Sequence, residues 1–155
     1  MAQVEVEVIG LLARACERLV GSVFDALDEA GAVGLGTTHA LAIRVLDQGE
    51  LTARALATAL GVTPQAAGRI SSDLEQQGLV ERGRDPRDAR ARPLRLTDAG
   101  RGVATTMRTA EERAVEQWRE AAGAANVATT ARALQAYLLA SEPARLPQAR
   151  RMRFT

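Results

Sequence analysis

The side chains that offer the clearest chemistry in this chain are six arginines between residues 79 and 100. A guanidinium group pairs with phosphate through two parallel hydrogen bonds, and its charge suits a narrow, electronegative minor groove. Turn-forming residues lie among the arginines, and short apolar segments at 79–80 and 94–96 flank them. We therefore predict a β-hairpin, or wing, whose loop presents cations, although a solvated charged loop would explain this segment taken alone. The six are Arg82, Arg84, Arg87, Arg90, Arg92 and Arg95.

The composition of the chain limits what else it can do. It has 155 residues, of which 46% are hydrophobic and 25% charged, as expected of one globular domain with a core. No apolar run approaches the roughly 20 residues of a membrane span, and no secretory signal is seen, so a cytoplasmic protein without membrane contact is expected. A single cysteine, Cys16, and a single histidine, His39, argue against an internal disulfide and a metal site. No cofactor is expected.

The net charge of the chain is +1, but its sign changes along the sequence. Residues 1–50 carry three arginines and eight acidic residues, a net charge of −5. Residues 51–102 carry nine arginines and six acidic residues, and residues 103–155 carry eight and five, so each of these segments has a net charge of +3. A basic middle section after an acidic start predicts that one part of the chain meets a polyanion.

Helical periodicity dominates the first fifty residues. Apolar residues recur every three or four positions over residues 4–30, which predicts one long amphipathic helix. Glycines from Gly31 to Gly36 end this helix and form a loop. Thr37 or Thr38 is expected to cap a second helix that ends near residue 47.

A helix-turn-helix pattern lies directly before the arginine-rich segment. Thr52 is the predicted cap of a short third helix that ends at Gly61. Thr63 and Pro64 then form a start signal for a fourth helix that reaches residue 77, with Thr63 as the cap and Pro64 in the first turn. Any short helical hairpin can share this pattern, but a wing directly after it favours a winged helix-turn-helix.

Two further helices follow the wing. Thr97 is expected to cap a fifth helix, and a sixth is expected after Gly123, over roughly residues 126–140. The first, fifth and sixth helices carry apolar faces that a small helix-turn-helix core cannot bury, so we predict a two-fold homodimer. Its two recognition helices would meet successive major grooves of a palindromic site. The expected division is a helical dimerisation region, a winged DNA-binding domain and a long connecting helix, at residues 1–34 with 123–155, 35–100 and 97–122 respectively.

Residues 35–100 resemble the MarR family of winged helix-turn-helix transcription regulators. Three motifs in a fixed order carry the resemblance: Gly-Leu-Val-Glu-Arg at 78–82, Asp-Pro-Arg-Asp-Ala-Arg at 85–90, and Leu-Thr-Asp-Ala-Gly at 96–100. One departure is Gly68, because recognition helices of this family often carry Thr or Ser there. A glycine inside a helix also costs about 1 kcal/mol relative to alanine.

The resemblance implies a mainly α fold of the α+β kind, with six helices and a two-stranded wing. It also implies a sequence-specific regulator, a repressor that binds double-stranded DNA as a homodimer. The residue types agree, because Gln pairs with adenine, Arg with guanine, and an Ala methyl touches that of thymine. Asp88 is expected to orient a wing arginine, and Arg90 to enter the minor groove. The expected DNA contacts are Thr63, Pro64, Gln65, Ala66, Arg69, Arg84, Arg87, Asp88, Arg90 and Arg92.

Several alternatives stay open at the level of sequence. Thr63 could serve only as a helix cap, and Arg69 could contact phosphate without reading a base. The chain could instead be a winged-helix module for protein contacts, or a redox-sensing regulator that uses Cys16. An enzyme is disfavoured because the sequence has no catalytic triad, phosphate-binding glycine loop or metal cluster. If a small-molecule effector releases the DNA, His39 and Cys16 are its candidate contacts.

Overall fold

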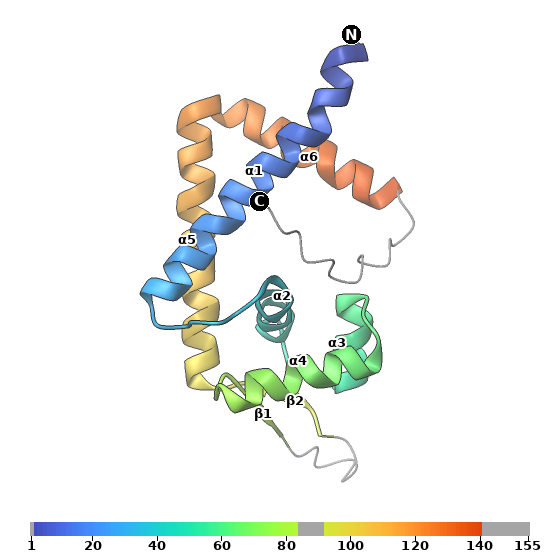
Figure 1. The fold of residues 1–155 in the computed structure, drawn as a ribbon, viewed down its shortest axis with the longest axis vertical. Coiled ribbons are helices and arrows are strands. Elements are labelled where there is room, and N and C mark those ends of the chain that lie inside the picture. The colour runs from blue at the N-terminus through green and yellow to red at the C-terminus, as the bar shows by residue number, and fades with distance from the viewer. Residues whose placement is uncertain (1, 84–91, 141–155) are drawn as a thin grey trace. The chain divides into compact units, whose positions relative to one another are not determined.

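The computed structural model describes residues 2–83 and 92–140 (Figure 1). These residues form six helices and one two-stranded antiparallel sheet, which confirms the predicted mainly α winged fold. None of the helices in the described ranges is long and apolar enough to cross a membrane. In chain order the elements are α1 (Ala2–Glu29), α2 (Thr37–Leu46), α3 (Ala53–Leu60), α4 (Pro64–Gln76), β1 (Val80–Arg82), β2 (Leu94–Leu96), α5 (Asp98–Ala122) and α6 (Ala124–Ala140).

The chain folds as two compact units. The first comprises residues 1–34 and 105–132, and so contains α1, most of α5 and the start of α6. The second comprises residues 35–104 together with the chain from residue 133 onward. It contains α2, α3, α4 and both strands, which are the elements predicted to carry the functional side chains.

The first unit buries one face of each of its long helices. Val23 and Leu27 of α1 are buried, as are Met107, Ala110 and Ala114 of α5. The spacings of three and four residues place these side chains along single stripes, as the apolar periodicity predicts.

Other large apolar side chains of α1 and α6 stay exposed. Ile9 of α1 is 74% exposed and Leu139 of α6 is 80% exposed, values that a side chain reaches only when little packs over it. The chain by itself therefore leaves part of these apolar surfaces in contact with water. The full set is Val8, Ile9, Leu11, Leu12 and Val20 of α1 and Leu134, Tyr137, Leu138 and Leu139 of α6.

In the second unit, α2, α3 and α4 pack on one another around a core in which Ile43, Leu56 and Leu74 are fully buried. The Ala55 N–H donates to Oγ1 of Thr52 at 3.2 Å, so Thr52 caps α3 as predicted. The helix ends at Gly61, whose φ of 63° lies in the left-handed region that glycine adopts without strain. The chain then reverses toward α4, which completes the helix-turn-helix.

The starts of two helices differ from the prediction. Gly36 is the N-cap of α2, rather than Thr37 or Thr38, and its N–H donates to Nδ1 of His39 at 3.2 Å. The imidazole takes the place that a Glu or Gln side chain usually has in a capping box. The helix α6 begins at Ala124, two residues before the predicted start, because the Val127 N–H already donates to the Gly123 carbonyl at 3.2 Å.

The sheet is a hairpin that also joins the linker before α3. Val80 pairs with Leu96 and Arg82 with Leu94, so the first strand lies slightly later than the predicted segment 79–80. Leu51 adds a bridge to Leu94 through hydrogen bonds of 3.1 and 2.7 Å. Burial of Val80, Leu94 and Leu96 turns one face of the hairpin toward the core, which sets its register.

Thr97 and Gly100 join the start of α5 to the turn between α4 and β1. The Thr97 hydroxyl donates to the Gly78 carbonyl at 2.6 Å and accepts the Gly100 N–H at 3.1 Å, so it caps α5 as predicted. A Cβ on Gly100 would lie 2.0 Å from the carbonyl oxygen of Leu79, a distance that no side chain tolerates. This close approach of the first turn of α5 to Leu79 requires glycine at position 100.

Candidate DNA-binding surface

The first two turns of α4 combine a polar outer face with an apolar inner one. Thr63 is the N-cap, because its Oγ1 accepts the Ala66 N–H at 3.2 Å, and Pro64 occupies the first helical position. Proline there forfeits no helical hydrogen bond, and its fixed φ suits the helix. Ala67 and Ile70 are buried on the opposite face, so packing sets the rotation of α4 about its axis.

The predicted reading residues share the outer face. Gln65 and Arg69 are exposed and four positions apart, so their side chains are neighbours along the helix. Ala66 beside them is half-buried. In the part of the chain that the structure describes, no ion pair engages Arg69. Its five N–H donors are therefore available to a polar partner in solution.

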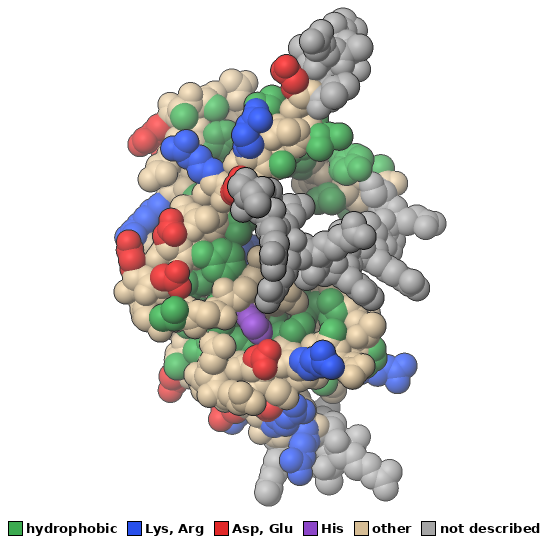
Figure 2. Space-filling model, in the orientation of Figure 1, with side chains coloured by type: hydrophobic (Ala, Val, Ile, Leu, Met, Phe, Trp, Pro, Cys, Tyr) green, Lys and Arg blue, Asp and Glu red, His purple; other side chains and the backbone are tan. Residues whose placement is uncertain are grey.

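Contacts to α2 and β1 hold α4 in place. Nε2 of His39 lies 3.4 Å from Oδ2 of Asp73, which joins the start of α2 to the middle of α4. The imidazole reaches the surface, where Figure 2 shows it in purple. Near the end of α4, Oε1 of Glu75 lies 2.8 Å from Nε of Arg82 on β1. These contacts orient the helix relative to both the helical core and the wing.

The wing arginines that the structure describes, Arg82, Arg92 and Arg95, have different surroundings. Arg82 pairs with α4, and Nε of Arg95 lies 2.8 Å from Oε1 of Glu81, with Glu50 at 3.8 Å from its Nη1. Both arginines therefore attach the strands to the rest of the domain. Arg92 is exposed just before β2. The predicted contacts that lie outside the described residues are Arg84, Arg87, Asp88 and Arg90.

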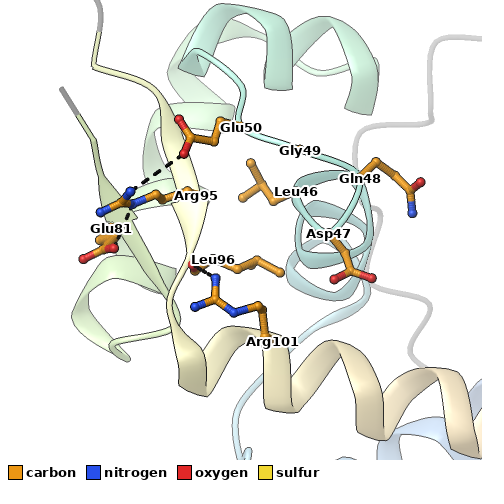
Figure 3. Close-up of a pocket in the computed structure, with 9 residues that line it drawn as sticks. All are labelled: Leu46, Asp47, Gln48, Gly49, Glu50, Glu81, Arg95, Leu96 and Arg101. Carbon is orange, nitrogen blue, oxygen red and sulfur yellow. Dashed lines mark hydrogen bonds and ion pairs between the residues drawn. The ribbon is translucent and has the colours of Figure 1, made fainter. Parts of the chain in front are cut away.

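A hollow of about 440 Å³ lies beside these ion pairs (Figure 3). Leu46 and Leu96 supply apolar lining, while Glu81 and Arg95 lie at its edge. Arg101 of α5 donates to the Leu96 carbonyl at 2.8 Å. The charged groups that line the hollow pair with one another. We therefore assign these groups to holding the wing strands on the domain, rather than to binding a ligand.

An exposed cation that is not among the contacts expected from the sequence is Arg54 of α3. It lies two positions after the N-cap Thr52, where the positive end of the helix dipole disfavours an arginine. Within residues 2–83 and 92–140 no ion pair compensates for that placement. Because the first helix of a helix-turn-helix crosses the DNA backbone, Arg54 suits a phosphate contact. The signal in the sequence was a basic residue in the first turn after a strong cap.

The two candidate effector contacts belong to different units. Cys16 is exposed on α1 in the first unit. His39 lies in the second unit, where its imidazole already contacts Gly36 and Asp73. Across the described ranges, no cluster of three or more His, Cys, Asp or Glu side chains could hold a metal ion.

Comparison with known proteins places this architecture in a family. Residues 33–91 match the family model of the MarR family, whereas no curated protein matches the chain. The structure of RV1404 from Mycobacterium tuberculosis has a TM-score of 0.70 at 25% identity, covering 88% of this chain and 92% of that one. The MarR family transcription regulator SP03579 has a TM-score of 0.71 at 20% identity, with coverages of 89% and 87%. CouR from Rhodococcus jostii RHA1, determined with p-coumaroyl-CoA bound, has a TM-score of 0.66 at 24% identity, with coverages of 86% and 94%.

The family match covers α2, α3, α4 and β1, which are the elements that build the candidate surface. The similar structures extend over most of both chains, so they include the long helices as well. Residues 33–91 therefore match the MarR family, and the chain has the fold of solved transcription regulators of that family.

Proposed function

We propose that this chain is a transcription regulator that binds a specific sequence in double-stranded DNA. One observation carries the proposal: the exposed polar start of α4, capped by Thr63 and held by the packing of its other face. A helix start of this kind fits the major groove and reaches base edges with its first side chains. Because a fold alone does not assign a function, the chemistry of that face is what supports the proposal.

Each side chain on the surface has a role in this proposal. Gln65 pairs with an adenine, Arg69 with a guanine, and the methyl group of Ala66 touches that of a thymine. Thr63 orients the helix through its cap. Arg54, which lies on α3, contacts a DNA phosphate. This contact positions the domain on the duplex without reading the base sequence. Figure 2 shows arginine side chains over the part of the domain that contains these elements.

The wing supplies the second group of DNA contacts in this proposal. Arg84, Arg87, Arg90 and Arg92 approach the minor groove, where negative potential attracts guanidinium groups. Asp88 orients one of these arginines through an ion pair. Arg82 and Arg95 do not join them, because glutamates already hold both.

We place two copies of the chain on one palindromic operator. The apolar side chains left exposed on α1 and α6 support a homodimer, because association would remove them from water. A two-fold dimer then presents two copies of α4 to half-sites about one helical turn apart. Such a dimer on a promoter represses by excluding the transcription machinery.

An effector would release the operator by shifting the spacing of the two copies of α4. CouR, which shares the fold, was determined with p-coumaroyl-CoA bound, and this supports a small organic effector as a hypothesis for the present chain. Cys16 and His39 stay the candidate effector contacts. The few aromatic side chains, 3% of the sequence, argue against a large aromatic pocket.

The decisive experiment selects duplexes from a random-sequence library with the full-length chain and then titrates binding against salt. A DNA-binding regulator should enrich a palindromic motif. Its affinity should fall with salt at a logarithmic slope of roughly −0.9 for each phosphate neutralised. Failure to enrich any motif, together with salt-insensitive capture of a protein partner, would instead favour a winged-helix module for protein contacts.

A further inference from the structure

Gly68 stands inside α4, four residues after the first helical residue, Pro64. Apart from proline, glycine is the least favourable residue within a helix, because it loses the most backbone freedom when the helix forms. A helical glycine is explained when a side chain would clash, when the helix bends, or when φ is positive. Gly100 is an example of the first kind, since a Cβ there would meet the Leu79 carbonyl oxygen.

None of these reasons applies to Gly68. A Cβ at this position would meet no described atom within 4 Å, so the protein leaves open space there. Its φ is not positive, and α4 continues as a regular helix to Gln76. On the evidence of the described residues, folding of this domain does not need glycine at position 68.

The open space lies beside the reading face of α4. Gln65 precedes Gly68 by three residues, and Arg69 follows it directly. Ser72, one turn further along, is small and half-buried. Position 68 is therefore a low point in the helix surface, next to the two long side chains that the proposed function assigns to base reading.

We propose that Gly68 allows the backbone of α4 to come into van der Waals contact with the DNA duplex, and so determines how deeply the helix enters the groove. This inference rests on the proposed DNA-binding function. A β-carbon at position 68 would fill the space that the duplex occupies and hold the helix further out, as we expect for recognition helices that carry Thr or Ser there. The side chains of this chain are fitted to the deeper position that glycine allows. Gln65 and Arg69 would then be too far from the base edges for well-formed hydrogen bonds.

The test replaces Gly68 by alanine in the full-length chain. We expect Gly68→Ala to raise Tm by about 2–4 °C, because alanine favours the helix and its Cβ meets no described atom within 4 Å. We expect it also to weaken binding to a duplex selected by the wild-type chain, by about tenfold or more, as overfilling of a close contact does. Gain in stability with loss of binding is the combination that a purely structural role does not produce.

The matched control is Gly102→Ala. Gly102 also lies inside a helix, α5, and a Cβ there likewise meets no atom of the described residues within 4 Å. It should raise Tm by a similar amount and change affinity for the selected duplex by less than about twofold. Gly68→Ser provides a second variant, since its hydroxyl could bond to phosphate while its Cβ still occupies the space.

The outcomes separate this inference from the function on which it rests. If the wild-type chain prefers no selected duplex over a scrambled duplex of equal length, the proposed function fails. If it shows that preference but Gly68→Ala or Gly68→Ser binds equally well or more tightly, only the role of Gly68 is overturned. A fall in Tm on Gly68→Ala would also overturn it, because the fold would then need the glycine.

Discussion

At the scale of single residues, arginines of one short region differ in what their charge can do. Arg82 has a glutamate 2.8 Å away, whereas Arg69, thirteen residues earlier, is exposed and has no such partner in the described chain. Neutralising an arginine that is already paired removes a link between elements. Neutralising an exposed one removes a group that is free to meet a ligand. Their partners, rather than their residue type, therefore separate attachment from recognition.

We predict that Arg69→Ala relaxes the sequence preference of the protein. If Arg69 pairs with a guanine, the change should cost about 1–3 kcal/mol in binding to the selected duplex and much less with scrambled DNA. Competition binding with both duplexes measures the difference. Arg113→Ala on α5, another exposed arginine, is the control and should leave both affinities unchanged. Equal losses on both duplexes would show that Arg69 contacts only phosphate.

At the scale of elements, the strongest local signals decided where helices begin. Thr52, Thr63 and Thr97 were predicted caps, and each accepts a backbone N–H three residues later. Such signals could be read from the sequence because the cap and its partner are close in the chain. The start of α2 could not, because a glycine and a histidine replace the usual cap residues there.

The candidate site was predictable to a smaller extent. The outer face of α4 follows from helical periodicity, and Gln65 and Arg69 are exposed on it while Ala66 is half-buried. The pairing of Arg95 with both Glu50 and Glu81 was not predictable, because it depends on how a linker and two strands meet. The same holds for the need for glycine at position 100, which arises only once the first turn of α5 has come close to the Leu79 carbonyl.

We predict that loss of the cap at Thr63 lowers the stability of the domain. Thr63→Ala should reduce the free energy of unfolding by about 1 kcal/mol, because the Ala66 N–H loses its acceptor. Thr52→Ala removes the equivalent bond from α3 and should cost a similar amount. Urea denaturation of both variants measures this. If Thr63→Ala also weakens DNA binding well beyond Thr52→Ala, its hydroxyl has a DNA contact in addition to the cap.

A sharper prediction concerns Gly100, where the first turn of α5 meets Leu79. Gly100→Ala should destabilise the domain by about 1–3 kcal/mol or prevent folding, since the new Cβ would overlap backbone that has little room to move. Gly102→Ala, two residues later in the same helix, should instead stabilise it by up to about 1 kcal/mol. Thermal unfolding of the pair gives the comparison. Similar Tm values for both variants would contradict the close approach at Leu79.

At the scale of the whole molecule, the apolar surfaces of α1 and α6 are the feature that the single chain does not explain. Helices of this kind gain most of their stability from packing rather than from propensity. Exposed leucines at two adjacent positions, Leu138 and Leu139, would be unfavourable in a chain that stays monomeric. A second copy of the chain is the partner that a palindromic DNA site would require.

We therefore predict that the protein is a homodimer at micromolar concentration and that Leu138→Glu dissociates it. Burial of one leucine side chain stabilises the dimer by about 1.5–3 kcal/mol, and a two-fold dimer buries two copies of Leu138. The dissociation constant should therefore rise on the order of 10²–10⁴-fold. Because Leu138 is 69% exposed in the single chain, the substitution should leave the fold of the protomer intact. Ala136→Glu adds the same charge on the face of the helix opposite Leu138 and is the control. Light scattering gives the mass of each variant, and circular dichroism checks its helicity. A monomeric wild-type protein, or a Leu138→Glu variant that stays dimeric, would remove α6 from the interface and with it this explanation of its exposed leucines.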